Sequence, residues 1–171
     1  EFKRVDLHEG IESTLTILQN RLQRQAKRSE IQVVKDYGKL PLVECYAGQL
    51  NQVFLNILNN AIDALEECKG QNSLTIRIGT ETDGKQVKIA IADNGVGMSE
   101  ETQKRIFDPF FTTKGVGKGT GLGMAIVYQI VTEKHGGTIS CDSTVGQGTI
   151  FTIVIPRSNI IFPETVARTT K

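Results

Sequence analysis

Three stretches of the sequence repeat apolar residues every three or four positions, which is the spacing of a helix with one buried face. They span residues 6–28, about 47–67 and 122–134. The last one stops at Gly136 and Gly137, where a helix readily ends. The middle one has the broadest apolar face, formed by Leu50, Val53, Phe54, Ile57, Leu58, Ala61 and Leu65. We therefore predict three helices.

Five shorter segments have the apolar pattern of strands. They are residues 31–36, 74–80, 86–92, 138–143 and 149–155. Turn-forming residues separate the second segment from the third and the fourth from the fifth, so each of these pairs is predicted to form a β-hairpin.

Residues 93–121 are rich in glycine and have few regularly spaced apolar residues. Such a long stretch is typical of a functional loop or lid, and we expect one short helix in it, near 99–107. The order of elements favours an α/β (α+β) two-layer sandwich, in which about three helices cover one face of a mixed sheet of about five strands. The tail, 157–171, has weak patterning.

Length and composition agree with one globular domain. The 171 residues are 39% hydrophobic and 23% charged, which is ordinary globular usage. The net charge of +1 argues against nucleic acid as a partner, and no apolar run approaches the ~20 residues of a membrane-spanning helix. Three widely spaced cysteines fit a reducing compartment. We expect a cytoplasmic location, whether the parent protein is soluble or membrane-bound.

A polar stripe runs along the middle helix. Asn56, Asn60 and Asp63 are spaced i, i+4 and i+7, so they lie on one face, away from the apolar side. The amide oxygen of asparagine is a hard neutral ligand that suits Mg²⁺, an ion that keeps most of its waters and phosphates. An ordinary solvated helix face explains the same residues and is more common.

The segment from Asp93 to Met98, which contains Gly95 and Gly97, follows directly after an alternating strand. A carboxylate at a strand end can accept a hydrogen bond from an exocyclic amine such as that of adenine, and glycines let the backbone approach a flat ring. A simple strand-ending turn uses the same residue types, so both interpretations stay open at this point.

Residues 115–123 contain five glycines and lead directly into the third helix. Glycines let successive backbone N–H groups turn toward one anion, and Lys114 and Lys118 add positive charge. The segment therefore indicates a phosphate-binding loop, although a flexible linker is the alternative. It matches neither the Walker pattern nor a Rossmann fingerprint.

Inside the glycine-rich region, one stretch of five residues contains three phenylalanines, Phe107, Phe110 and Phe111. They favour either an aromatic clamp that packs the lid or docks a partner, or a small satellite core under a long loop.

In order and spacing these four segments resemble the motifs of sensor histidine kinases. The asparagine box falls on residues 56–61, the first glycine box on 93–97, the phenylalanine box on 107–111 and the second glycine box on 119–123. The resemblance covers roughly residues 5–156. It is to the catalytic ATP-binding domain of that family, within the superfamily of gyrase, heat-shock chaperone, histidine kinase and mismatch-repair proteins (GHKL), and implies a Bergerat-type fold with a nucleotide lid.

The resemblance implies roles for single residues in binding ATP, with ADP as the product. Asn60 matches the asparagine that ligates Mg²⁺, and Asn56 matches a second asparagine near the phosphates. Asp93 matches the carboxylate that binds the adenine amine, helped by Gly97 and by a water that Thr149 is expected to hold. Asp63, Gly95, Met98 and Phe107 are further residues expected to bind ATP.

The phosphate side is implied by the second glycine box. Its members are Gly119, Thr120, Gly121, Leu122 and Gly123. Lys114 and Lys118 are the expected contacts of the γ-phosphate, and Asn56, Asn60 and Lys114 form the expected catalytic set. Phosphoryl transfer depends mainly on positioning and charge neutralisation, which this set supplies.

The family's phosphoacceptor histidine is missing from the sequence. The segment that begins at His8 lacks the expected proline and lies too close to Asn56, so His8 is expected to be an exposed residue of the first helical turn and His135 a helix C-terminal residue. We therefore expect a catalytic domain at 29–156, preceded by a helix or junction at 1–28 and followed by a tail at 157–171. Its partners would be a histidine-containing dimerisation domain and a response regulator receiver domain.

Two other functions are compatible with the motifs. A conformational ATPase of the same superfamily typically has glutamate at the position of Asn56, as the general base for water. Asparagine cannot take that proton, which disfavours rapid hydrolysis. A non-catalytic nucleotide sensor is the second alternative, although all four motifs look intact.

Overall fold

The computed structural model describes residues 1–68, 70, 73–111 and 122–158. The strands are β1 (Phe2–Val5), β2 (Ile31–Tyr37), β3 (Val43–Tyr46), β4 (Leu74–Thr82), β5 (Gln86–Asp93), β6 (Thr138–Thr144) and β7 (Gly148–Pro156). The helices are α1 (Leu7–Ile17), α2 (Gln19–Leu22), α3 (Ala47–Glu66), α4 (Glu100–Arg105), α5 (Gly123–Gln129) and the π-helix η1 (Ile130–Lys134).

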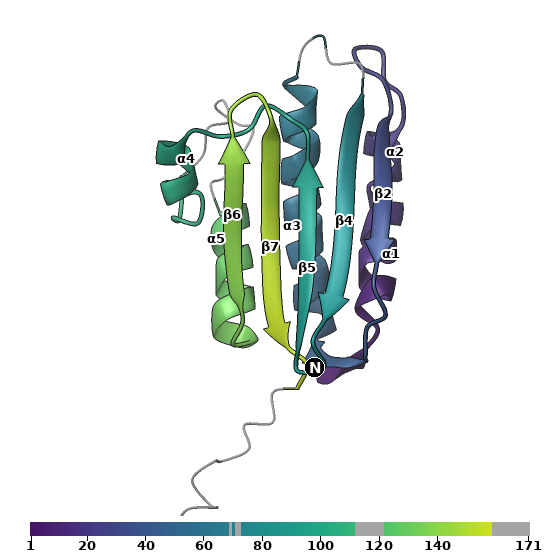
Figure 1. Ribbon diagram of the computed structural model, residues 1–171, viewed down its shortest axis with the longest axis vertical. Coiled ribbons are helices and arrows are strands. Elements are labelled where there is room, and N and C mark those ends of the chain that lie inside the picture. Colours follow the sequence, from purple (N-terminus) through teal and green to yellow (C-terminus); the bar gives the residue numbers. More distant parts are fainter. Residues whose placement is uncertain (69, 71–72, 112–121, 159–171) are drawn as a thin grey trace, which may run out of the picture.

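The principal sheet has five strands in the order β2-β4-β5-β7-β6. The β2–β4 pair is parallel and the other pairs are antiparallel, so the sheet is mixed. Figure 1 shows α1, α3 and α5 side by side behind this sheet, while its other face carries no helix. The predicted two-layer sandwich is therefore confirmed, with the predicted strands and hairpins.

Helix α3 occupies the middle of the helical layer (Figure 1). Its apolar face is buried against the sheet through residues that are at most 2% exposed: Leu50, Val53, Phe54, Ile57, Leu58, Ala61, Ile62 and Leu65. On the sheet side the alternation of β4, β5 and β7 supplies the matching layer, including Ile78, Ile89 and Ile153. Burial of α3 on one face leaves its opposite face available for polar contacts.

The first predicted helix, 6–28, is wrong in its extent. Helix α1 ends at Ile17 and a separate single turn, α2, follows, so the chain after Leu22 is not helical. The N-terminal part of the prediction is confirmed, because the Asp6 side chain accepts a hydrogen bond from the His8 backbone N–H, 2.9 Å, as an N-cap. Leu7, Ile11, Leu15 and Leu18 are buried in the common core, whereas the charged residues beyond them lack an apolar face.

A second, two-stranded sheet was not predicted. Strand β1 pairs antiparallel with β3, from Phe2 opposite Tyr46 to Val5 opposite Val43. Each strand has only four residues, which is too short for a clear alternating pattern. This small sheet leads from the first residues of the chain to the start of α3.

His8 is also different from its prediction. Its side chain is only 21% exposed, and its ring stacks on Tyr37 with centroids 4.3 Å apart. The Nε2 atom lies 2.8 Å from the Thr80 hydroxyl. The imidazole therefore fills a gap between α1 and the sheet instead of pointing to solvent.

His135 stands at the C-terminal end of η1, as predicted, but it is 2% exposed. Its Nδ1 donates to the Ile130 carbonyl, 2.9 Å, and its Nε2 accepts from the Tyr46 backbone N–H, 3.1 Å. Only the neutral ring can make both bonds. Burial accordingly lowers the pKa of His135 below 6.5. Through its two hydrogen bonds the ring links η1, which continues α5, to Tyr46 at the start of α3.

No helix among the residues that the structure describes is long and apolar enough to cross a bilayer.

His135→Gln is expected to lower the free energy of unfolding by about 1 kcal/mol at pH 7.5, because buried hydrogen bonds are lost. Since folding depresses the pKa of His135, the contribution of the neutral ring is present above pH 6.5 and is lost as the pH falls below it. Urea unfolding at pH 7.5 and 5.0 should therefore show a smaller gap between the two proteins at the lower pH. A gap that widens on acidification would contradict the assignment.

Candidate functional site

The carboxylate of Asp93 lies at the end of β5, in the sheet interior, and the residue is only 7% exposed. Oδ1 accepts from the Gly95 backbone N–H at 2.8 Å, and the Thr149 backbone N–H also supports the carboxylate. Burial raises the pKa of Asp93 from 3.8 to about 6, although these two N–H groups pull the pKa down. At neutral pH the site thus contains a desolvated, largely ionised hydrogen-bond acceptor.

The turn after Asp93 approaches its neighbours closely, and this requires glycine. A Cβ on Gly95 would lie 2.8 Å from the Ala64 carbonyl of α3, and one on Gly97, whose φ is +72°, would lie 2.1 Å from the Thr144 carbonyl oxygen. The Val96 N–H donates to the Ala64 carbonyl at 3.3 Å. The first glycine-rich segment is therefore fixed against α3.

A hydroxyl, that of Thr149, lies next to Asp93, and a second, that of Ser143, lies next to Thr149. Thr149 is directly opposite Asp93 in the β5–β7 pair, and its Oγ1 lies 2.7 Å from the Ser143 hydroxyl on β6. The Ser143 hydroxyl in turn accepts from the Met98 backbone N–H at 2.7 Å. Thr149 and Met98 are predicted site residues, whereas Ser143 was missed, because a serine in an alternating hairpin strand has no distinguishing sequence signal.

Asn56 connects α3 to the second glycine-rich segment. Its Nδ2 donates to the Gly123 carbonyl at the start of α5, 3.1 Å, and Leu122 is the N-cap of that helix. Asn60 is half-buried one turn further along α3. On α3, Asn60 thus lies between Asn56, which contacts α5, and Ala64, which contacts the segment after Asp93.

Asp63 extends the polar stripe but is turned toward α2. Its Oδ1 accepts from Arg21 at 2.9 Å, and the same guanidinium also donates to Asn59, 2.9 Å, and to Glu66. Arg21 thereby neutralises the acidic end of the stripe, a contact 42 residues apart in sequence that no local pattern could reveal.

The phenylalanines separate into different environments. The Phe107 ring packs against Tyr128 and Phe151, with centroids 5.5 and 6.4 Å apart, as the satellite-core interpretation expects. Phe110 is 75% exposed, and Phe111 lies under the Arg105 guanidinium, 4.5 Å from the ring centroid. Phe107 thus connects the segment after α4 to the sheet.

Several predicted phosphate contacts lie outside the described residues, namely Lys114, Lys118, Gly119, Thr120 and Gly121. They stay predictions.

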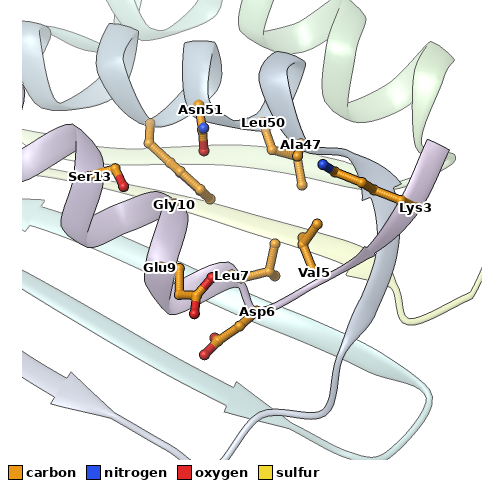
Figure 2. Close-up of a pocket in the computed structure, with 11 residues that line it drawn as sticks. Lys3, Val5, Asp6, Leu7, Glu9, Gly10, Ser13, Ala47, Leu50 and Asn51 are labelled. Atoms are coloured by element: carbon orange, nitrogen blue, oxygen red, sulfur yellow. The ribbon is translucent and has the colours of Figure 1, made fainter. Parts of the chain in front are cut away.

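A cavity of about 230 Å³ lies elsewhere, between β1, α1 and the first turns of α3. Figure 2 shows Asn51 pointing from α3 toward Gly10 of α1, and a Cβ on Gly10 would lie 2.5 Å from Asn51 Oδ1. None of the predicted site residues lines this cavity, so it is distinct from the site around Asp93.

The donor set can be tested against a divalent cation. Across the described part of the chain, no group of three or more histidine, cysteine or acidic residues could hold a metal ion by itself. A single half-buried amide, Asn60, fits Mg²⁺ that arrives on a phosphate group and keeps its water ligands.

Among the described residues, the site thus combines a buried carboxylate and an asparagine pair with one helix, α3, that contacts both the Asp93 turn and the start of α5. The family model described as histidine kinase-, DNA gyrase B- and HSP90-like ATPase matches residues 46–159. The chain belongs to this ATPase family. The resemblance to the catalytic ATP-binding domain of histidine kinases is confirmed by its relatives.

Sporulation kinase E of Bacillus subtilis (strain 168) is 40% identical over 136 residues, which cover 79% of this chain and 18% of the relative. The sensor histidine kinase ZraS of Escherichia coli (strain K12) is 38% identical over 153 residues, covering 89% and 30%. The chain thus spans less than a third of the length of these curated relatives. The solved catalytic domain of the histidine kinase ThkA, nucleotide-free, superposes with a TM-score of 0.77 at 29% identity, covering 92% of this chain and 99% of that domain.

Asp93→Asn is expected to stabilise the domain at neutral pH, because it removes a buried charge. The raised pKa means that the contribution of Asp93 to wild-type stability is present below pH 3.8 and is lost as the pH rises through about 6. The free energy of unfolding of the variant, relative to wild type, should increase by about 2–3 kcal/mol between pH 4 and pH 7.5. Urea unfolding at both pH values measures this difference.

Asp83→Asn is the matched control. Backbone N–H groups of Gln86 and Lys85 hold the pKa of Asp83 below 3.8, so its pH dependence has the opposite sign. If the difference in free energy of unfolding between Asp93→Asn and wild type does not change with pH, the raised pKa of a buried Asp93 carboxylate is contradicted.

Proposed function

We propose that this chain binds Mg·ATP and transfers the γ-phosphoryl group to a histidine on a separate dimerisation domain. One observation carries the proposal: α3 contacts the Asp93 turn through Ala64 and the start of α5 through Asn56. Asn60 lies on the same helix between these two contacts. A nucleotide with its base at Asp93 and its phosphates near Gly123 would therefore extend along Asn60.

On the base side, the Asp93 carboxylate would accept a hydrogen bond from the adenine amine. Gly95 and Gly97 let the backbone approach the ring, and Thr149 stands beside the carboxylate. Met98 and Phe107 would complete the apolar surroundings of the base.

On the phosphate side, Asn60 would ligate Mg²⁺, which when bound supplies charge neutralisation between the phosphates. Asn56, together with Gly123, would hold the adjacent backbone in place. Lys114 and Lys118 would contact the γ-phosphate, and Gly119, Thr120 and Gly121 would present backbone N–H groups to the chain of phosphates. Asp63 would stay on the rim, since Arg21 holds it.

Transfer to an imidazole requires positioning and charge neutralisation more than an added base. The amide of Asn56 cannot accept a proton from water, so we expect hydrolysis of bound ATP by water to be slow compared with transfer to a histidine acceptor. This favours a kinase over a conformational ATPase.

The proposed partners follow from the same assignment. The histidine kinase ThkA has been solved in complex with the response regulator protein TrrA, and that structure superposes on this chain with a TM-score of 0.72 at 25% identity, covering 91% of this chain and 42% of ThkA. We propose a histidine-containing dimerisation domain as the direct acceptor and a receiver domain downstream. Residues 1–28 would form the junction to the former and 29–156 the catalytic unit, in the cytoplasm.

Incubation with γ-labelled ATP and Mg²⁺ tests the proposal. The chain alone should bind ATP without labelling itself, and adding a histidine-containing dimerisation domain should give an acid-labile label on that domain. The same domain with its histidine replaced by alanine is the control. Rapid phosphate release by the chain alone would instead support the ATPase, and binding with neither outcome would support a sensor.

Asn60→Asp is expected to disturb the handling of Mg²⁺, because it adds a negative charge near the phosphates. Affinity for ADP without Mg²⁺ should fall by about tenfold or more, and added Mg²⁺ should recover part of it. Calorimetry with and without Mg²⁺ measures both effects. Asn51→Asp, which adds the same charge to α3 beside α1, should leave both affinities unchanged; equal effects of the two substitutions would contradict the metal assignment.

A further inference from the structure

One side chain, Arg21 of α2, contacts the C-terminal half of α3 at three points. Its Nη1 donates to Asn59 at 2.9 Å, and its Nη2 donates to Asp63 at 2.9 Å and to Glu66. The three acceptors are spaced i, i+4 and i+7 along α3, so they form one row on the helix surface. A planar guanidinium presents its N–H groups as a fixed fork and can hold such a row together.

Arg28 fixes the backbone from which Arg21 extends. Its side chain is only 9% exposed, and it donates to three backbone carbonyls, those of Arg21, Gln23 and Ser29. Its Nε also donates to Glu66, with Oε2 at 3.4 Å. Glu66 therefore has two arginine partners, and the segment that carries Arg21 is anchored to the end of α3.

Of the two acidic residues in the row, Asp63 is the neighbour of Asn60. It follows Asn60 by three residues, and side chains at that spacing lie on adjacent turns of the same helix face, with Cβ atoms about 5–6 Å apart. The Asp63 side chain is 29% exposed, and carboxylate oxygens are preferred ligands of Mg²⁺. The bond to Arg21 is the contact that turns this carboxylate toward α2.

The direction in which Asp63 points has consequences for a bound nucleotide. Turned toward Arg21, the carboxylate is neutralised and stays apart from the amide of Asn60. Turned toward Asn60, it would repel phosphates that arrive without a cation and would offer a second oxygen ligand to a cation that accompanies them. The position of this carboxylate therefore sets how strongly nucleotide binding depends on Mg²⁺.

We propose that Arg21 is a positioning residue for the metal site: it holds Asp63 toward α2, so that the carboxylate neither repels the phosphates nor competes with Asn60 for Mg²⁺. This inference rests on the proposed nucleotide site and deepens it. It gives α2, a single turn outside the four sequence motifs, a role in nucleotide binding.

Calorimetric titration with ADP, in the absence and in the presence of Mg²⁺, tests the role of Arg21. The quantity to compare is the ratio of the dissociation constant without Mg²⁺ to the dissociation constant with Mg²⁺. In Arg21→Gln this ratio should rise about fivefold, since a carboxylate beside the phosphates weakens metal-free binding more than metal-bound binding. A purely structural role would weaken both equally and leave the ratio unchanged, which would overturn the inference.

Two double variants of equal net charge identify the carboxylate that matters. Arg21→Gln with Asp63→Asn should return the ratio to within about twofold of wild type, because the repelling charge is gone. Arg21→Gln with Glu66→Gln should keep the ratio raised, because Asp63 is still present. Equal ratios in the two double variants would contradict the role of Asp63. Arg77→Gln, which breaks an exposed ion pair with Asp36 on the sheet, is the matched control and should leave the ratio unchanged.

The outcomes separate this inference from the proposed function. If wild type binds ADP neither with nor without Mg²⁺, the proposed function fails. If Asn60→Asp changes the ratio but Arg21→Gln does not, the metal site stands and the role of Arg21 is excluded. Should Arg21→Gln fail to fold by itself, the comparison of its two double variants, each with one carboxylate fewer, decides between the same outcomes.

Discussion

The burial of the Asp93 carboxylate at the end of β5 is the constraint on which the rest of the site depends. The hydrogen bonds that support it come from the backbone N–H groups of Gly95 and Thr149, so its stabilisation requires a tight turn and an adjacent strand at fixed distances. Main-chain partners leave the carboxylate basic enough to accept a further N–H, and burial makes such a bond stronger than it would be in water. Gly95 and Gly97 allow this tight turn, because neither position has room for a Cβ.

Helix α3 turns that local constraint into an extended site. Its apolar face is buried on the sheet, its Ala64 carbonyl accepts from Val96 in the Asp93 turn, and its Asn56 side chain donates to Gly123 at the start of α5. Asn60 lies between these contacts, while Arg21 holds Asp63 at the far end of the stripe. A single rigid helix thus sets the separation between the base side and the phosphate side, which suits a reaction that depends on positioning.

The sequence predicted what depends on periodicity, and it failed where a contact is long-range or an element is short. Helix α3, the hairpins and Asp93 at a strand end could be predicted because burial repeats at fixed intervals. Strands β1 and β3 are too short to show such a pattern, and the partners of His8, Asp63 and Ser143 are 72, 42 and 45 residues away. Ser143 in particular looks like any serine of an alternating strand, and its contacts with Met98 and Thr149 can be found only in the structure.

The central claim is that Mg·nucleotide lies along α3 between Asp93 and Gly123, and NMR titration of the ¹⁵N-labelled chain with Mg·ADP tests it most directly. The account predicts that the backbone amides of Gly95 and Gly123 and the side-chain amide of Asn60 shift together, with one affinity. Perturbations that leave these three unchanged, or that concentrate around Gly10 and Asn51 in the cavity between α1 and α3, would contradict it.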